Sequence, residues 1–303
     1  MTTPTLAALA FALMTPAAAQ AFTVTVLDTV VLPEMEVGDR SLAEVSGLAF
    51  DPASGVLYGV SDQNDLYTFD LDVTGDRLTL TPAGGVRLTD AEGERLRGKD
   101  FDAEALALTT ADGQPRLMIL SEGGPRAGIF GTDGRMIDDL PLPDGLTAAL
   151  DARPGNQGPE SLTRHPEGWF LTAPERPQRL GDGTVRHGLL TSDGRDLGYT
   201  MPEVEATRIK AVSALDDGRM LILERSQNDA TDALLTNLRL LDPAACDNGT
   251  CPTTPAPINV PGITDANFEG LAQISDDLFV MVSDDQINKE QRSVFVLMRV
   301  EGM

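Results

Sequence analysis

The chain contains few of the residues on which zinc enzymes and nucleic-acid-binding proteins depend. Its 303 residues include two cysteines, two histidines and only three lysines, and its formal net charge is −24. A zinc or copper site draws on cysteine and histidine, so neither metal is expected. Nucleic acid and anionic membranes need a basic surface, so this charge makes them poor candidate partners. No apolar stretch is long enough to span a bilayer, and no Gly-x-Ser-x-Gly motif indicates an α/β-hydrolase.

The first 21 residues carry no charge and contain an apolar run at residues 6–14, followed by an alanine-rich stretch. This pattern is typical of a secretory signal peptide cleaved after Ala19 or Ala21, although the usual basic residues before the apolar run are missing. We therefore expect residues 1–21 to be a signal peptide and residues 22–303 to form a single domain. The expected location is the periplasm or the medium outside the cell.

The two cysteines, Cys246 and Cys251, are five residues apart. In an exported chain we expect them to form a small disulfide that closes a loop. A metal or redox role is the alternative. A metal site would need further soft ligands, and the only histidines are His165 and His187.

Short apolar and β-branched runs separated by Asp-Gly and Pro-x-Gly turns indicate β-strands along the whole chain. The strand pattern also contains an imperfect sequence repeat. Each copy begins at a polar residue, crosses two apolar stretches separated by a turn, and ends at Asp or Glu. The opening residues are Ser46, Glu104, Glu160, Lys210 and Glu269, and the closing residues are Asp62, Glu122, Glu175, Glu224 and Asp284.

The length of this repeat predicts the fold. Successive opening residues are 50 to 59 residues apart, which is room for four antiparallel strands. The last copy has room for only three, and the strand-like segment at residues 22–31 can supply the fourth. The sequence thus predicts an all-β fold, a β-propeller of five four-stranded blades closed by the N-terminal strand joining the C-terminal blade. Six blades, a β-sandwich and a right-handed β-helix are the alternatives.

In a propeller, the start of each first strand and the end of each second strand meet at one mouth of the central channel. Crowded carboxylates there need protons, arginine partners or a bound cation. Hard oxygen ligands favour Ca²⁺, with Mg²⁺ as the second choice. The expected metal ligands are Glu104, Glu122, Glu160, Glu175, Glu269 and Asp284. Further ligand-binding candidates are Ser46, Asp62, Arg153, Asn156, Glu224 and Asn267. The alternative is a structural role, in which Lys210 and nearby arginines pair with these carboxylates.

Several of these segments resemble the bacterial phytase-like propeller family, whose members are described by an esterase-like activity of phytase. The similar motifs are Ser46-Gly47-Leu48-Ala49, Asp102-Ala103-Glu104-Ala105-Leu106-Ala107, Asn156-Gln157-Gly158-Pro159-Glu160-Ser161-Leu162 and Asn267-Phe268-Glu269-Gly270-Leu271-Ala272. The resemblance covers roughly residues 24–300. It implies a propeller fold and hydrolysis of phosphoesters.

If the protein is a hydrolase, calcium held by the glutamates would neutralise the mouth and polarise a phosphoester. The catalytic candidates are Glu160, Lys210, Arg225 and Glu269, and Lys210, Arg153 or Arg225 would stabilise the phosphoryl charge. We expect a monomer acting on a small molecule, with a phosphorylated substrate as the first choice. The alternatives are a non-catalytic periplasmic binding or scaffold propeller with structural calcium, a gluconolactonase-like lactonase, and a five-bladed calcium-activated nucleotidase.

Overall fold

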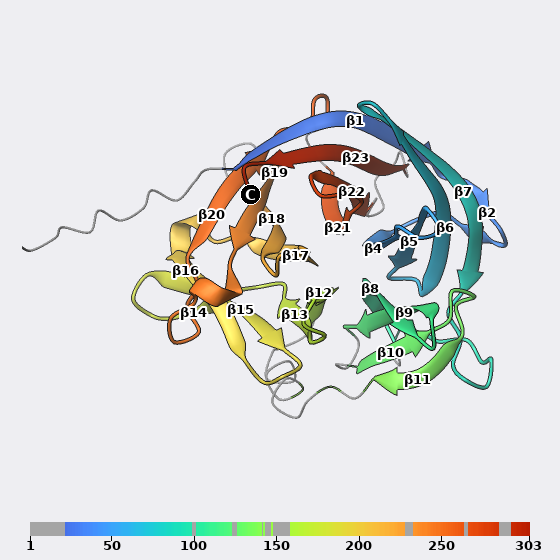
Figure 1. Ribbon diagram of the computed structural model, residues 1–303, viewed down its shortest axis with the longest axis horizontal. Coiled ribbons are helices and arrows are strands. Elements are labelled where there is room, and N and C mark those ends of the chain that lie inside the picture. Colours follow the sequence, from blue (N-terminus) through green and yellow to red (C-terminus); the bar gives the residue numbers. More distant parts are fainter. Residues whose placement is uncertain are drawn as a thin grey trace, which may run out of the picture.

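The strands are arranged as five antiparallel sheets around a central axis in the computed structural model (Figure 1). The structure describes residues 22–98, 101–122, 126–140, 142, 147, 158–227, 233–263, 266–284 and 292–303. The first strand of each sheet packs against the first strands of its two neighbours, so these five strands surround the channel. The fold is a five-bladed β-propeller, as the repeat length predicted, and the alternatives are excluded.

The first four blades each follow the chain from the channel outward. Blade 1 contains β4 (Val45–Asp51), β5 (Val56–Ser61), β6 (Asp65–Thr74) and β7 (Arg77–Arg87). Blade 2 contains β8 (Ala103–Ala111), β9 (Gln114–Ser121), β10 (Arg126–Phe130) and β11 (Met136–Leu140). Blade 3 contains β12 (Pro159–Arg164), β13 (Phe170–Pro174), β15 (Thr184–Thr191) and β16 (Asp196–Pro202), and the short β14 (Gln178–Arg179) also pairs with β15. Blade 4 contains β17 (Arg208–Ala214), β18 (Met220–Gln227), β19 (Leu234–Leu241) and β20 (Thr253–Ile258).

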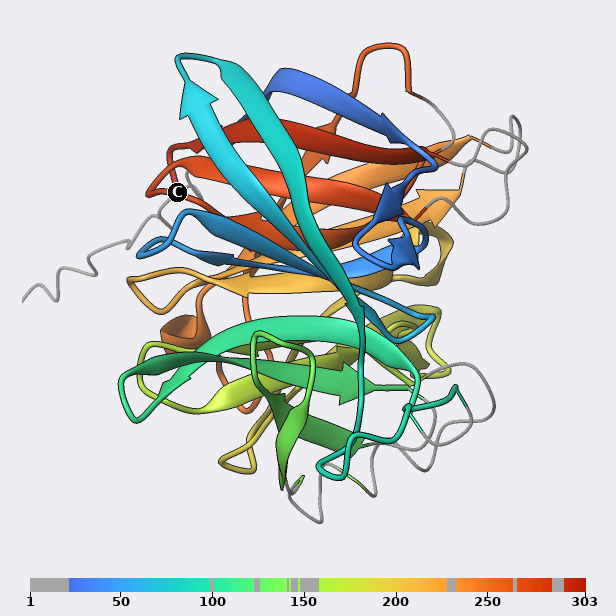
Figure 2. The ribbon, with the colours of Figure 1, turned by 90° about the vertical axis from the view of Figure 1, so that its right-hand side faces the viewer.

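Blade 5 is built from both ends of the chain. It contains β21 (Asn267–Gln273), β22 (Leu278–Asp284) and β23 (Arg292–Glu301), and its outer strand is β1 (Thr23–Pro33). The antiparallel pairing runs from Thr23 opposite Glu301 to Pro33 opposite Arg292. Figure 2 shows β1 (blue) beside β23 (red). This confirms the predicted closure, which ties the first and last blades together and pairs an edge that would otherwise stay open.

Burial follows the position of each strand in its blade. The innermost β4 and β21 are buried at nearly every residue, because neighbouring blades pack against both of their faces. The outer β7 instead begins with an alternation of exposed and buried residues, as expected where one face meets solvent. Aromatic contacts join neighbouring sheets: the ring centroids of Phe69 in blade 1 and Phe295 in blade 5 are 5.3 Å apart, edge to face.

Three smaller elements complete the described part of the chain. A hairpin of β2 (Glu36–Val37) and β3 (Arg40–Ser41) precedes blade 1. The other two elements are short 3-10 helices, η1 (Glu203–Glu205) and η2 (Pro243–Ala245). The predicted disulfide between Cys246 and Cys251 is present. Among the described residues, no helix is long and apolar enough to cross a membrane. The predicted signal peptide lies outside the described residues.

Candidate functional site

The five residues that open the repeats lie at the start of the innermost strands, at one mouth of the channel. We call Ser46, Glu104, Glu160, Lys210 and Glu269 the ring. Each of them is skipped by the pairing between the first and second strands of its blade, so each is the extra residue of a β-bulge. A bulge leaves its extra residue unpaired and redirects its side chain. The repeat therefore encodes a backbone irregularity at the mouth as well as a polar residue.

On one side of the mouth, a lysine holds three carboxylates together. Lys210 Nζ lies 2.5 Å from Glu160 Oε2, 2.6 Å from Glu269 Oε1 and 3.1 Å from Glu175 Oε1. Burial alone would lower the pKa of Lys210, but the three carboxylates outweigh it and raise this pKa. The ammonium thus stays charged, and three of the six predicted metal ligands are already engaged by a cation of the protein itself.

Three arginines also contact Glu175. Its Oε1 lies 3.2 Å from Arg208 Nη1 and 3.5 Å from Arg225 Nη2, and its Oε2 lies 3.5 Å from Arg176 Nε. Burial raises the pKa of Glu175, but Lys210 and Arg208 outweigh it and hold this pKa below its ordinary value. Glu175 is therefore ionised at neutral pH, and it places Arg225, a predicted catalytic residue, beside the lysine.

A second group of carboxylates lies on the blade 2 side of the mouth. One oxygen from each of Asp102, Glu104 and Glu122 lies within 4.8 Å of the other two. Among the described residues, no ion pair joins any of the three to a cation. We call these residues the carboxylate triad. Burial, reinforced by the surrounding carboxylates, raises the pKa of Glu104 well above its ordinary value, and burial also raises the pKa of Asp102 and of Glu122.

Blade 3 comes unusually close to this triad, and a glycine permits it. The backbone N–H of Gly158 donates to Glu122 Oε1 over 2.9 Å. A Cβ atom on Gly158 would lie 2.3 Å from Glu122 Cγ, closer than any side chain tolerates. The glycine in the motif before Glu160 therefore lets the chain donate a hydrogen bond to Glu122 and fix its orientation.

A third group connects blades 5 and 1. Asn267 Nδ2 donates to Glu269 Oε1 over 2.8 Å and to Asp284 Oδ2 over 3.3 Å. Burial raises the pKa of Asp62 to about 8, with further increases from Glu44, Asp284 and other carboxylates. Asp62 is thus protonated near neutral pH. Asp284, a predicted metal ligand, is grouped with Asn267 and Asp62, and does not belong to the carboxylate triad.

The structure places one candidate away from the mouth. The side chain of Glu224 is fully buried and accepts hydrogen bonds from Tyr199 Oη, from Thr207 Oγ1 at 3.1 Å and from Arg239 Nε at 2.9 Å. These contacts engage Glu224 inside the protein. Arg153 and Asn156 lie outside the described residues.

Asp102 joins the candidate metal ligands although the repeat pattern did not select it. It precedes β8 and stands two residues before Glu104. Alternate residues of an extended chain point to the same side, so this spacing was the available signal. The backbone N–H of Asp102 donates to Ser121 Oγ over 2.8 Å, and that of Glu122 donates to the carbonyl oxygen of Asp102 over 2.9 Å. These bonds hold the ends of β8 and β9 together.

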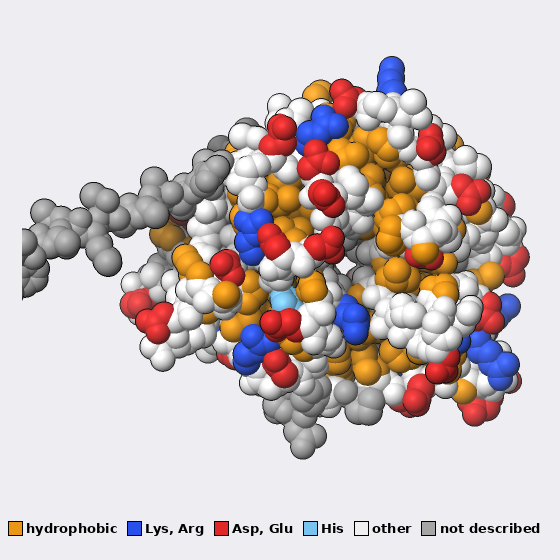
Figure 3. Space-filling view, in the orientation of Figure 1, with side chains coloured by type: hydrophobic (Ala, Val, Ile, Leu, Met, Phe, Trp, Pro, Cys, Tyr) orange, Lys and Arg blue, Asp and Glu red, His pale blue; other side chains and the backbone are white. Residues whose placement is uncertain are grey.

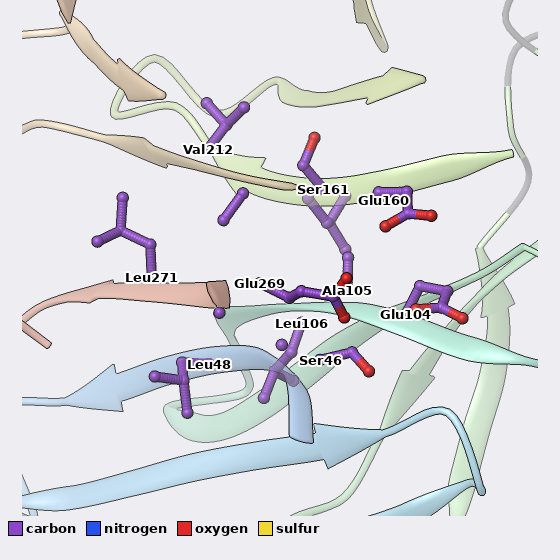
Figure 4. Close-up of a pocket in the computed structure, with 14 residues that line it drawn as sticks. Ser46, Leu48, Glu104, Ala105, Leu106, Glu160, Ser161, Val212, Glu269 and Leu271 are labelled. Carbon is purple, nitrogen blue, oxygen red and sulfur yellow. The ribbon is translucent and has the colours of Figure 1, made fainter. Parts of the chain in front are cut away.

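Below the ring, a collar of apolar side chains nearly closes the channel. Each blade contributes one aliphatic residue two positions after its ring residue: Leu48, Leu106, Leu162, Val212 and Leu271. Figure 4 shows Leu48, Val212 and Leu271 on one side of this pocket and the oxygens of Ser46, Glu104 and Glu160 on the other. The free volume at this level is about 10 Å³, against about 290 Å³ in the cavity beyond it. A ligand of the ring must therefore enter through the polar mouth.

Comparisons with known proteins agree with the sequence motifs. The profile of the phytase-like family, described as "esterase-like activity of phytase", matches residues 40–287. No curated protein matches the chain. Among solved structures, the WD40 domain of Pan2 from Neurospora crassa matches 91% of this chain and 68% of that chain, with 12% sequence identity and a TM-score of 0.37, too low a similarity to support an argument. Since the family match spans most of the chain, including the whole ring, the protein belongs to the phytase-like family.

Proposed function

We propose that the protein is an exported hydrolase of phosphoesters or related esters that works with a divalent cation, Ca²⁺ before Mg²⁺, at the polar mouth. The observation that supports this most strongly is the carboxylate triad. Three partly buried carboxylates that converge and form no ion pair with any described residue suit a hard cation that prefers oxygen ligands. Membership in the phytase-like family supports the hydrolytic activity. The disulfide between Cys246 and Cys251 supports export, because such bonds persist in oxidising compartments.

In this proposal, Asp102, Glu104 and Glu122 hold the cation. A divalent cation there supplies Lewis-acid polarisation of a phosphoryl or carbonyl oxygen. The ring places Glu160 and Glu269 beside Glu104 in the same pocket. Because the free volume of this pocket is only about 10 Å³, the substrate would bind over the mouth, across the triad and the lysine on the opposite side.

Glu160 is the candidate for proton transfer. Burial raises its pKa to about 7 even though Lys210 opposes the shift, so both of its protonation states are populated at neutral pH. A group with this pKa is suited to accept a proton from an attacking water or to donate one to a leaving group. In the proposal, the positive charges of Lys210 and Arg225 stabilise negative charge that develops on the substrate. Glu175 and Glu269 keep the ammonium of Lys210 in position.

Turnover of phytate, p-nitrophenyl phosphate and p-nitrophenyl acetate, measured with Ca²⁺, with Mg²⁺ and with a chelator, tests the proposal. We expect activity on at least one ester that is lost in the chelator and in Glu104→Gln. Asp139→Asn is the matched control, because Asp139 is an exposed carboxylate paired with Arg126 in the outer part of blade 2. Equal, near-zero rates in all conditions would refute the hydrolase. Chelator-sensitive melting without turnover would instead favour a binding propeller with structural calcium.

A further inference from the structure

A groove with an unusual concentration of arginines lies beside the mouth, along blade 3 and the start of blade 4. Its cavity has a volume of about 520 Å³ and is lined by Arg176, Pro177, Arg179, Val185, Glu203, Ala206, Thr207 and Arg208. Three of the chain's twenty arginines therefore face one cavity of a protein whose net charge is −24. We call this cavity the arginine groove.

The side chains that line the groove carry more positive than negative charge. Arg179 Nε lies 2.7 Å from Glu203 Oε1, and Glu203 is the one acidic side chain among the described residues that line the groove. Arg176 and Arg208 both contact Glu175. All three guanidinium side chains stay at least 40% exposed. Arg179 and Arg208 each pair with one carboxylate in the described part of the chain, and since a guanidinium has five N–H donors, both keep donors for a second anion.

The groove adjoins the mouth through one atom. Glu175 Oε1 lies 3.1 Å from Lys210 Nζ, which belongs to the ring, and 3.2 Å from Arg208 Nη1, which lines the groove. A molecule of modest size that binds over the mouth can therefore also extend over Arg208. The mouth and the groove together form one asymmetric surface.

Apolar groups complete the groove. Pro177, Val185 and Ala206 are part of its lining. Two exposed apolar residues, Leu180 and Val204, directly follow Arg179 and Glu203 in the chain, and the exposed fraction of Val204 is 95%. A ligand that used all of these features would have an anionic group beside an apolar body.

We propose that the arginine groove binds the part of the substrate that is not hydrolysed, and that this part is a small organic anion with an apolar body. The anionic group is a carboxylate or a phosphate, since a guanidinium binds either one in the same bidentate manner. This inference rests on the proposed function only in taking the ligand to be the substrate. The binding itself can be measured without turnover and without a divalent cation.

Isothermal titration calorimetry in the presence of a chelator provides the test. We expect phenyl phosphate and benzoate to bind, neutral benzyl alcohol not to bind, and the affinity for both anions to fall as NaCl is raised. The relative affinities of the two anions identify the preferred headgroup. Benzyl alcohol binding as tightly as benzoate would overturn the proposal.

Four variants locate the binding. Arg179→Gln should weaken anion binding roughly three- to tenfold, the loss of one partly exposed charged contact. Glu203→Gln should strengthen it, because the competing carboxylate is removed. Arg77→Gln is the matched control: like Arg179, Arg77 is paired with one carboxylate, and the exposed fractions of the two side chains are 83% and 81%. Equal affinities in wild type, Arg179→Gln and Arg176→Gln would overturn the proposal. Anion binding without any turnover would refute the proposed hydrolase, while the inference that the groove binds an anion would stand.

Discussion

The ammonium of Lys210 and the carboxylate of Glu269 are 2.6 Å apart and come from neighbouring blades. Lys210 lies on β17 in blade 4 and Glu269 on β21 in blade 5, while Glu160, 2.5 Å from the same ammonium, lies on β12 in blade 3. One cation therefore joins three blades at the mouth of the channel. This contact links the stability of the propeller to the electrostatics of its candidate site.

Replacement of Lys210 should destabilise the protein. Lys210→Met leaves Glu160, Glu175 and Glu269 buried without their shared cation, and breaking a buried ion pair in this way costs about 3–5 kcal/mol. Urea unfolding measures the loss. Adding Glu160→Gln to the variant should recover part of it, because one uncompensated carboxylate is removed. A single variant as stable as wild type would show that the ammonium does not hold these blades together.

Stability in the presence of a chelator should fall as the pH rises from about 5 to 8. The pKa of Asp62 is raised to about 8 and that of Glu160 to about 7. Both values exceed those of the unfolded chain, so the folded state binds more protons in this range and loses stability as they dissociate. The pKa of Glu175 is lowered instead, so its contribution to stability is lost only as the pH falls below about 4.5, the ordinary value of a glutamate.

Melting temperatures across this pH range, with chelator and with Ca²⁺, check the prediction. Calcium should make the melting temperature decrease less with pH, since a bound cation can replace the protons in neutralising the mouth. Asp62→Asn and Glu160→Gln should each reduce the slope in the chelator. A melting temperature that rises between pH 5 and 8 would contradict the assigned direction.

The carboxylate triad should account for stabilisation by calcium. Ca²⁺ should raise the melting temperature of the wild-type protein at neutral pH, because a ligand that binds only the folded state stabilises it. Glu104→Gln should abolish the increase, and it should also raise the melting temperature in the chelator, since a crowded buried carboxylate has been removed. Asp139→Asn should respond to Ca²⁺ as the wild type does. An unchanged calcium response in Glu104→Gln would place the cation elsewhere.

The junction between blades 5 and 1 should tolerate no side chain at Gly270. A Cβ atom there would lie 2.7 Å from Val282 Cγ1 and 2.9 Å from Leu48 Cγ. Gly270→Ala should therefore cost about 1–3 kcal/mol in the free energy of unfolding, as overpacking of a core does. Gly98→Ala is the control, because no atom of the described residues other than its chain neighbour lies within 4 Å of its Cβ position and its φ is not positive. Equal stabilities of the two variants in urea would contradict this packing argument.

Much of the site could be predicted from the sequence because a repeat fixes equivalent positions. The spacing of the opening residues predicted that Ser46, Glu104 and Lys210 lie around one mouth, and the pocket and the ion pairs bring their neighbours together there. The repeat could not distinguish the carboxylate triad from the carboxylates that pair with Lys210. Contacts across blades decide which carboxylates Lys210 reaches, and those depend on side-chain conformations that no repeat pattern specifies.

Glu224 shows a second limit, that of strand register. The repeat pattern gave Glu224 and Glu175 equivalent places at the mouth, but Glu224 pairs with Ile209 as Pro174 pairs with Pro159, so Arg225 occupies the position of Glu175 in blade 4. In the structure Glu175 binds Lys210, whereas Glu224 is enclosed by Tyr199 and Arg239. The residues that enclose Glu224 come from the outer strands β16 and β19, which lie outside the repeated motif. An offset of one residue along a strand turns a side chain to the opposite face, so the expected position of Glu224 was wrong by one residue.

The sequence by itself determined the five-bladed propeller, its closure by the N-terminal strand, the disulfide and the polar ring. These features follow from local patterns: strand and turn periodicity, a fixed repeat length, and a polar residue that recurs at one place in each repeat. The tertiary structure alone decided how the charges are divided. Lys210 binds three carboxylates, Asp102, Glu104 and Glu122 converge with no ion pair to a described residue, and three arginines meet in one groove. The reason is physical, because the energy of a charge depends on its distance from other charges and on its burial, and both are set by the packing of blades that are remote in sequence.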